Sequence, residues 1–181
     1  MFNMKSFTRI LLAGVTLGMF AVPLRAEVVD SSAHGFTVRS TVIVQGPPKQ
    51  AYERFVREVG KWWDSNHTYT GESSNLSIDA QLGGSFSEKL PGGGFVEHMR
   101  VVYADPGKIL RMVGGLGPLQ ELGAAGAMTI SFAEIQTSTE VTMTYAVGGY
   151  MKQGLGSLAA IVNSVLALQL NRYKAHVDSH K

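Results

Sequence analysis

The chain has 181 residues, with 16 Lys and Arg against 14 Asp and Glu, and it contains no cysteine. This length suits one domain that can bury a core on its own, and the lack of cysteine excludes disulfides and a cysteine nucleophile. No cluster of basic residues occurs, so we do not expect a nucleic-acid-binding protein.

The first 26 residues have the layout of a secretory signal peptide. Lys5 and Arg9 precede an apolar run over residues 10–22, and a cleavage region follows that ends at Ala26. The alternative is a membrane anchor, but the run is shorter than the roughly 18–20 residues that a spanning helix needs. We expect a signal peptide over 1–26, a single ligand-binding domain over 27–181, and a periplasmic location.

The next segments predict a strand and a helix. Residues 35–45 alternate between apolar and polar side chains and stop at Gly46, which is typical of a strand. Pro48 suits the first turn of a helix, and apolar residues then recur at helical spacing as far as Gly60. A polar loop is expected over 65–74.

Six short alternating segments separated by turn residues follow, and they predict a meander of antiparallel strands. Their ranges are 75–79, 85–90, 95–104, 108–113, 127–135 and 139–147. A run of strands followed by one long helix indicates an α+β fold with an antiparallel sheet.

The last segment, 150–179, predicts that long helix. Its apolar side chains cover an arc of roughly 200°, whereas a surface helix needs only a stripe of about 100°. The arc consists of Leu155, Leu158, Ala159, Ile161, Val162, Val165, Leu166, Leu168 and Leu170. The helix is therefore expected to be buried along much of its circumference, or to line an apolar cavity with one flank.

Three stretches carry a resemblance to a known family: VIVQGPPKQAYERFVREVGKWW, GFVEHMRVVYADPGKILRMVGGLGPLQ and MTISFAEIQTSTEVTMTYAVGGY. Together with the long helix, they resemble the START-like (SRPBCC) superfamily. The nearest subgroup is that of polyketide cyclase/dehydrase and lipid-transport proteins, with bacterial homologues of a heat-shock ATPase activator. The resemblance implies a helix-grip fold, in which a curved sheet wraps around the helix and encloses a hydrophobic ligand cavity. The family has no universal catalytic motif, so the resemblance assigns no catalytic residue.

Strand alternation places three charged residues, Glu88, Glu97 and Arg111, on the side of the sheet that faces the helix. A buried unpaired charge is costly, so these groups are expected to pair with one another or with a polar group of a ligand. The alternative is an ion pair that only orients the sheet. A bulge, or a slip of one residue, would turn any of the three to solvent.

Two further stretches bear on the cavity. Gln169, Arg172, Tyr173 and His176 make the second half of the helix more polar, which predicts a polar mouth there, unless the helix simply extends past the sheet into water. Residues 114–126 combine glycines with leucines, and they predict either a gate over the cavity or a packed crossover with a short helix.

We therefore expect a protein that binds a small hydrophobic or amphipathic molecule, such as a lipid, a sterol-like molecule or an aromatic polyketide. The expected ligand contacts are Glu88, Glu97, Arg111, Trp63, Phe86, Met99, Tyr103, Phe132, Tyr145, Val162, Leu166 and Gln169. Trp62 and Trp63 are each candidates for the pocket wall or for a core plug. No metal site or cofactor is expected, because the histidines lack zinc-ligand spacing and no nucleotide-binding motif follows a strand.

Two alternatives remain open. The first is a cyclase- or dehydratase-type enzyme, in which Glu97 would move a proton and Arg111 or Tyr145 would stabilise a developing oxyanion. The second is a protein-interaction module with a filled core. The sequence leaves open the identity of the ligand and the oligomeric state.

Overall fold

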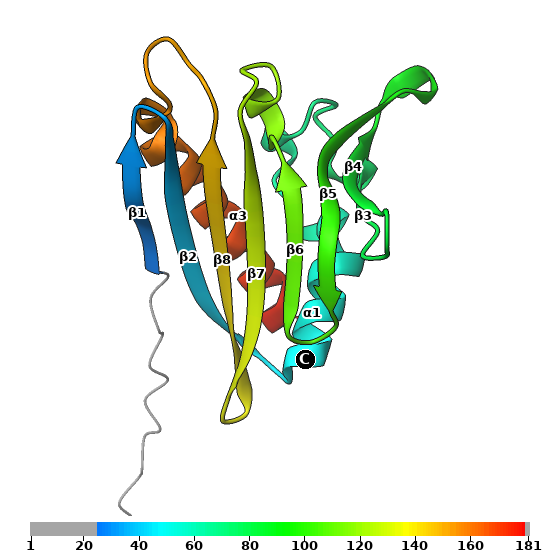
Figure 1. Cartoon of the computed structure of the whole chain (residues 1–181). Coiled ribbons are helices and arrows are strands. Elements are labelled where there is room, and N and C mark those ends of the chain that lie inside the picture. The colour runs from blue at the N-terminus through cyan, green and yellow to red at the C-terminus, as the bar shows by residue number, and fades with distance from the viewer. Residues whose placement is uncertain (1–24, 180–181) are drawn as a thin grey trace, which may run out of the picture.

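The computed structural model describes residues 25–179 and shows one eight-stranded antiparallel sheet with helices on one face (Figure 1). The strands run in the order β1-β2-β8-β7-β6-β5-β4-β3. Their bounds are β1 Arg25–Ser32, β2 Gly35–Gln45, β3 Leu76–Ile78, β4 Ser85–Lys89, β5 Phe95–Asp105, β6 Ile109–Gly114, β7 Ala125–Ile135 and β8 Ser138–Gly148. The α+β class and the six-strand meander are confirmed.

Three α-helices and five short 3-10 turns complete the structure. The helices are α1 Pro48–Arg57, α2 Val59–Trp62 and α3 Ala159–Ser179, and the turns are η1 Ser65–His67, η2 Ser73–Asn75, η3 Pro91–Gly93, η4 Gly117–Leu119 and η5 Leu155–Leu158. In Figure 1, α3 crosses the face of the sheet obliquely and its C-terminal end lies close to α1. None of the helices within 25–179 is long and apolar enough to cross a membrane.

The predicted signal peptide lies outside the described residues, apart from its last two. Arg25 and Ala26 begin β1, where they pair with Thr41 and Ser40 of β2. Sequence analysis did not predict β1. The reason is that all eight of its residues are exposed, so the strand has no inward row of apolar side chains to recognise.

The inward rows of β4, β7 and β8 are as predicted. Their buried side chains include Phe86, Glu88, Met128, Ile130, Phe132, Val141, Met143, Tyr145 and Val147. The apolar members of these rows belong to the hydrophobic core, and β7 and β8 contact α1.

The prediction for β5 holds only in its middle, at Met99 and Val101, because this strand contains two irregularities. The pairing shifts at His98 and again at Val102, and neither residue has a partner of its own on the adjacent strand. Each shift reverses the inward and outward alternation. As a result, His98 is buried, while Tyr103 is 48% exposed on the outer face.

The predicted orientation of β6 is also wrong. Leu110 and Met112 face the core, so Arg111 between them lies on the outer face with Val113. The sequence Ile-Leu-Arg-Met-Val has apolar residues on both faces, and alternation alone therefore does not distinguish its two orientations.

The long helix starts later than predicted and is less buried. Gly154 precedes the 3-10 turn η5 and Gly156 lies within it. The regular α-helix therefore begins only at Ala159. Ile161 and Leu168 are 62% and 41% exposed, although both belong to the predicted buried arc. The helix therefore packs through a narrower stripe, and one flank of it is open.

Candidate functional site

A cavity of about 510 Å³ lies beside the N-terminal half of α3, between that helix and the β4–β5 end of the sheet. Small-molecule sites typically have volumes of about 300–1,000 Å³. The lining residues are Trp63, Asn66, His67, Thr68, Tyr69, Leu76, Phe86, His98, Leu116, Gly117, Pro118, Leu119, Leu122, Tyr145, Leu158, Ile161, Val162, Val165 and Leu166. The interaction-module alternative required a filled core, and this cavity contradicts that requirement.

Five of the predicted ligand contacts line the cavity, namely Trp63, Phe86, Tyr145, Val162 and Leu166. They come from segments far apart in the chain, and the fold brings them together. The prediction that the helix lines a cavity with one flank is confirmed, since every wall residue from α3 lies within residues 161–166.

The two adjacent tryptophans have different roles. Trp63 lines the cavity, and its indole N–H donates a hydrogen bond to the carbonyl of His67 at 3.0 Å. Trp62 is a core plug, with only 1% of its surface exposed, and its ring lies 4.9 Å from that of Phe55. Both alternatives therefore hold, each for one of the two residues.

The loop over residues 115–124 covers part of the cavity and contains the 3-10 turn η4. It contributes Leu116, Leu119 and Leu122 to the wall, and the turn η4 corresponds to the short helix of the crossover alternative, so the loop has features of both predictions. The buried hydroxyl of Tyr145 holds the start of this loop. It donates to the carbonyl of Gly114 at 2.8 Å and accepts from the N–H of Leu116 at 3.1 Å. Burial raises the pKa of Tyr145 to about 12, so the phenol is neutral.

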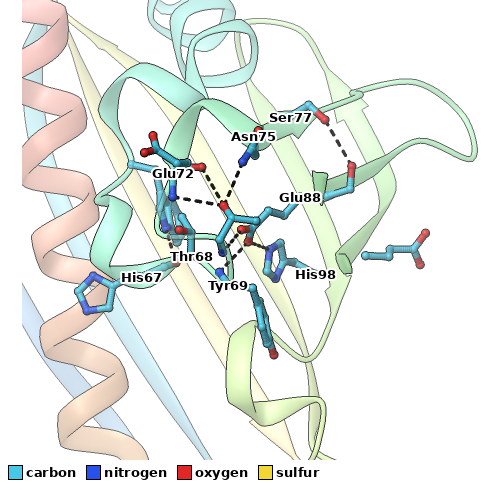
Figure 2. A network of polar contacts seen from close by, with 12 residues as sticks. His67, Thr68, Tyr69, Glu72, Asn75, Ser77, Glu88 and His98 are labelled. Carbon is cyan, nitrogen blue, oxygen red and sulfur yellow. Dashed lines mark hydrogen bonds and ion pairs between the residues drawn. The ribbon is translucent and has the colours of Figure 1, made fainter. Parts of the chain in front are cut away.

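Glu88 is fully buried behind the cavity wall and is not part of its surface. Its two oxygens accept hydrogen bonds from the backbone N–H groups of Tyr69, at 3.0 Å, and Thr70, at 2.7 Å (Figure 2). Burial raises the pKa of Glu88, but these bonds and the one from His98 lower it more, and the net pKa lies below its usual value. Glu88 is therefore an ionised residue that fixes the 69–70 backbone.

His98 connects Glu88 to the cavity. Its Nε2 lies 3.3 Å from Oε2 of Glu88, and the ring lines the cavity (Figure 2). Burial lowers the pKa of His98, and the Glu88 carboxylate offsets this only in part. Sequence analysis missed this residue, because only the β5 irregularity turns it inward.

The polar edge of the cavity is formed by residues 66–69 rather than by the end of α3. Gln169 is fully buried and positions this edge. Its Oε1 accepts from the N–H of Asp64 at 2.8 Å, and its Nε2 lies 3.0 Å from Nδ1 of His67. Since Oε1 is the acceptor from Asp64, Nε2 donates to Nδ1, and the other ring nitrogen of His67 carries the proton.

The predicted polar mouth at the C-terminal end of α3 is wrong. Arg172 donates from Nε to the carbonyl of Trp62 at 3.0 Å, and the Tyr173 hydroxyl donates to the carbonyl of Ala51 at 2.8 Å. His176 contacts Glu58 at 2.7 Å. These groups fasten α3 to α1 and α2, so they are structural.

The remaining predicted contacts lie away from the cavity. Met99 and Phe132 are buried in the core outside its wall. Glu97 forms an ion pair with Arg100 at 2.9 Å, with both side chains partly exposed. Arg111 donates from Nε to Thr129 and lies 5.8 Å from the centre of the Tyr103 ring, on the outer face. The expected inward positions of Glu97, Tyr103 and Arg111 are thus corrected.

The described wall has no Lys, Arg, Asp or Glu, and its polar side chains are confined to Asn66, Thr68, the tyrosines and the two histidines. Within residues 25–179, no three side chains of His, Asp or Glu come together as metal ligands would. The arrangement offers an apolar surface with a few neutral hydrogen-bonding groups. Such a wall suits the binding of an uncharged, largely apolar molecule.

Comparisons with known proteins give the fold and no closer relationship. No family model and no curated protein matches the sequence. Among solved structures, a conserved protein of unknown function from Enterococcus faecalis has 12% identity, with 88% of this chain and 79% of that chain covered and a TM-score of 0.57.

Two other solved structures carry more informative names. The Aha1 dimer from Colwellia psychrerythraea has 17% identity, with 80% and 98% of the two chains covered and a TM-score of 0.56. DynU16, a putative protein of the dynemicin biosynthetic locus, has 19% identity and a TM-score of 0.58, and the match covers 80% of this chain and 48% of DynU16. The structure thus shares its fold with these proteins, the Aha1 dimer and DynU16 among them.

Proposed function

We propose that this protein binds a small, uncharged and largely apolar molecule in the cavity beside α3. The observation that carries the proposal is a cavity of about 510 Å³ whose described wall is mainly apolar and lacks charged side chains. Each 200 Å² of apolar ligand surface removed from water would contribute about 5 kcal/mol, at ~25 cal/mol per Å². A soluble domain gains no stability from leaving such a space beside its main helix, because close packing is the more stable arrangement.

We also propose that the 115–124 loop is a gate through which the ligand enters. Leu116, Leu119 and Leu122 cover the cavity. Tyr145 fastens the start of the loop, and the side-chain amide of Gln120 donates to the carbonyl of Glu97 from its middle, so few side-chain bonds need to break for the loop to open. Limited proteolysis tests this idea. Ligand should slow cleavage within 115–124, and an unchanged rate would contradict the gate.

We also propose a subgroup for this protein and a cellular location. The sequence stretches described above support membership of the polyketide cyclase/dehydrase and lipid-transport subgroup, and residues 1–26 support export to the periplasm. Fractionation of cells that produce the full chain tests export. A processed protein in the periplasmic fraction is expected, and an unprocessed cytoplasmic protein would contradict it.

A second candidate function is catalysis by the Glu88–His98 pair. A carboxylate that orients a histidine is a common arrangement for a general base, and His98 lies in the cavity wall. The enzyme predicted from the sequence has less support. Glu97 and Arg111 lie on the outer face, and the Tyr145 proton is donated to Gly114. In an enzyme of this kind, His98→Gln would abolish turnover but leave substrate binding nearly intact.

Binding of the neutral fluorescent probe N-phenyl-1-naphthylamine tests the main proposal. The wild-type protein should bind it saturably at one site. Val162→Phe, which adds a ring inside the cavity, should weaken binding at least about tenfold, a change of ~1.4 kcal/mol. Leu168→Phe is the matched control, since this residue is exposed on the same helix and outside the wall. Equal affinities for the wild type and Val162→Phe would contradict the proposal.

A further inference from the structure

One buried polar atom of a wall residue has no partner among the described residues, and that atom is Nδ1 of His98. The residue is 4% exposed, and its ring forms part of the wall. Buried polar groups are nearly always hydrogen-bonded, and each exception calls for an explanation. The other nitrogen of the ring, Nε2, is occupied by Glu88 at 3.3 Å.

The contacts of Glu88 determine what kind of partner Nδ1 can take. The carboxylate accepts two backbone N–H groups, from Tyr69 and Thr70, so it stays ionised and has no proton to donate. Nε2 of His98 must then be the donor in the contact with Glu88. A neutral imidazole has one N–H, so Nδ1 carries a lone pair and acts only as an acceptor.

The position of the ring is fixed before any ligand arrives. Tyr69 stacks on it at 5.9 Å with an interplanar angle of 29°, and Phe86 lies 5.1 Å from it. Together with the hydrogen bond to Glu88, these two rings hold the imidazole in place. A fixed acceptor in an apolar wall adds directional preference at little entropic cost.

We propose that the ligand carries a neutral hydrogen-bond donor, the hydroxyl of an alcohol or phenol, which donates to Nδ1 of His98. This inference rests on the proposed function and narrows it from apolar molecules in general to hydroxylated ones. The apolar remainder of the ligand lies against Trp63, Leu116 and Val162.

The same wall disfavours an anionic headgroup. A fatty-acid carboxylate would meet no Lys or Arg in the described wall, and it would approach the lone pair of His98 with the Glu88 carboxylate behind that ring. Burying an unpaired charge is costly, and a second charge of the same sign nearby increases the cost. Of the ligand classes expected from the sequence, sterol-like and phenolic molecules therefore fit, whereas fatty-acid anions do not.

Three probes of one shape test the inference: 2-naphthol, 2-methoxynaphthalene and 2-naphthoate. Wild-type protein should bind the naphthol roughly fivefold to tenfold more tightly than the methyl ether, which lacks the donor proton. The naphthoate should bind most weakly. His98→Phe should remove the preference for naphthol over the ether. His34→Phe is the matched control, because His34 is exposed in the β1–β2 turn, away from the cavity.

The outcomes separate the two proposals. Equal binding of naphthol and ether to the wild type, or a preference that survives in His98→Phe, would overturn the role of His98 while leaving the cavity as a ligand site. If none of the three probes binds, the ligand site and the inference fail together.

A measurement on the wild type covers the case in which His98→Phe does not fold. With ¹⁵N-labelled histidine, the Nδ1 resonance of His98 should move as 2-naphthol is added and should stay still with the methyl ether. An Nδ1 resonance that responds equally to both compounds would overturn the inference.

Discussion

The two halves of α3 meet the sheet in different ways. In the C-terminal half, Tyr173 is fully buried, 5.2 Å from the ring of Phe55 and 5.5 Å from that of Trp62. In the N-terminal half, Val162 and Val165 border the cavity instead. One end of the same helix thus closes the core, and the other end leaves a space of about 510 Å³.

The difference originates in what faces each half, since both halves of α3 carry buried leucines, Leu166 and Leu170. Helices α1 and α2 place aromatic rings under the C-terminal half, where they fill the volume between helix and sheet. Beside the N-terminal half, the 115–124 loop, with its small residues and three leucines, and side chains such as Trp63 and Phe86 surround the cavity without filling it. The packed half therefore supplies stability, and the open half is available for a ligand.

Matched truncations on the two halves should give the largest contrast. Leu170→Ala in the packed half should lower the free energy of unfolding by about 3 kcal/mol, because it leaves a void at a fully buried position. Leu158→Ala, in the η5 turn just before the open half, should cost less than about 1 kcal/mol, since its side chain already borders the cavity. Urea unfolding measures both, and equal losses would contradict the distinction between the halves.

The next effect concerns the carboxylate behind the cavity. Glu88→Gln should lower the free energy of unfolding by about 2 kcal/mol, because an amide cannot accept both backbone N–H groups and the His98 proton as a carboxylate does. Glu97→Gln is the control, and its exposed pair with Arg100 predicts a loss below about 0.5 kcal/mol. A larger loss for Glu97→Gln than for Glu88→Gln would show that the sequence-based orientation of β5 was correct.

The pH dependence of stability should report on His98. Its pKa is lower in the folded state, so below the unfolded value of about 6.5 the unfolded chain binds a proton that the folded chain does not. Stability should therefore fall as the pH drops below about 6.5, by up to about 1.4 kcal/mol per pH unit.

His98→Phe should remove this component. Ionisable groups that do not contact His98 are common to both proteins, and their contributions cancel in the difference. Parallel curves of unfolding free energy against pH between pH 6.5 and 5 would contradict the assignment.

The smallest expected effects concern two buried tyrosines. Tyr145→Phe and Tyr173→Phe each remove one buried hydroxyl and should each cost about 1 kcal/mol of stability. Only Tyr145→Phe frees the start of the 115–124 loop, so it alone should speed dissociation of N-phenyl-1-naphthylamine, as measured by stopped-flow fluorescence. Equal dissociation rates for the two variants would exclude the Tyr145 hydroxyl as a fastener of the loop.

Sequence reasoning predicted the strand meander, the long helix and the leucine-rich loop over the cavity, because each has a simple period or composition. It also placed Trp63, Phe86, Tyr145, Val162 and Leu166 at the cavity. These residues lie on regular elements, or close to one, where alternation or helical spacing determines direction.

The polar residues were harder to place. The irregularity at His98 turns that side chain inward, and no local sequence pattern predicts this irregularity. Glu88 was expected to pair with another inward charge or with a ligand, but it accepts hydrogen bonds from the backbone of a loop 18 and 19 residues away. The polar end of α3 was misjudged because its partners, Trp62, Ala51 and Glu58, depend on how α1 and α2 pack.

The most direct test of a ligand site in the open half is a chemical-shift map of the backbone amides during titration with 2-naphthol. Saturable shifts should concentrate at Leu116, Tyr69 and Val162, while Phe55 and Tyr173 in the packed half should stay still. Shifts centred on the packed half, or shifts that grow linearly without saturation, would contradict the account.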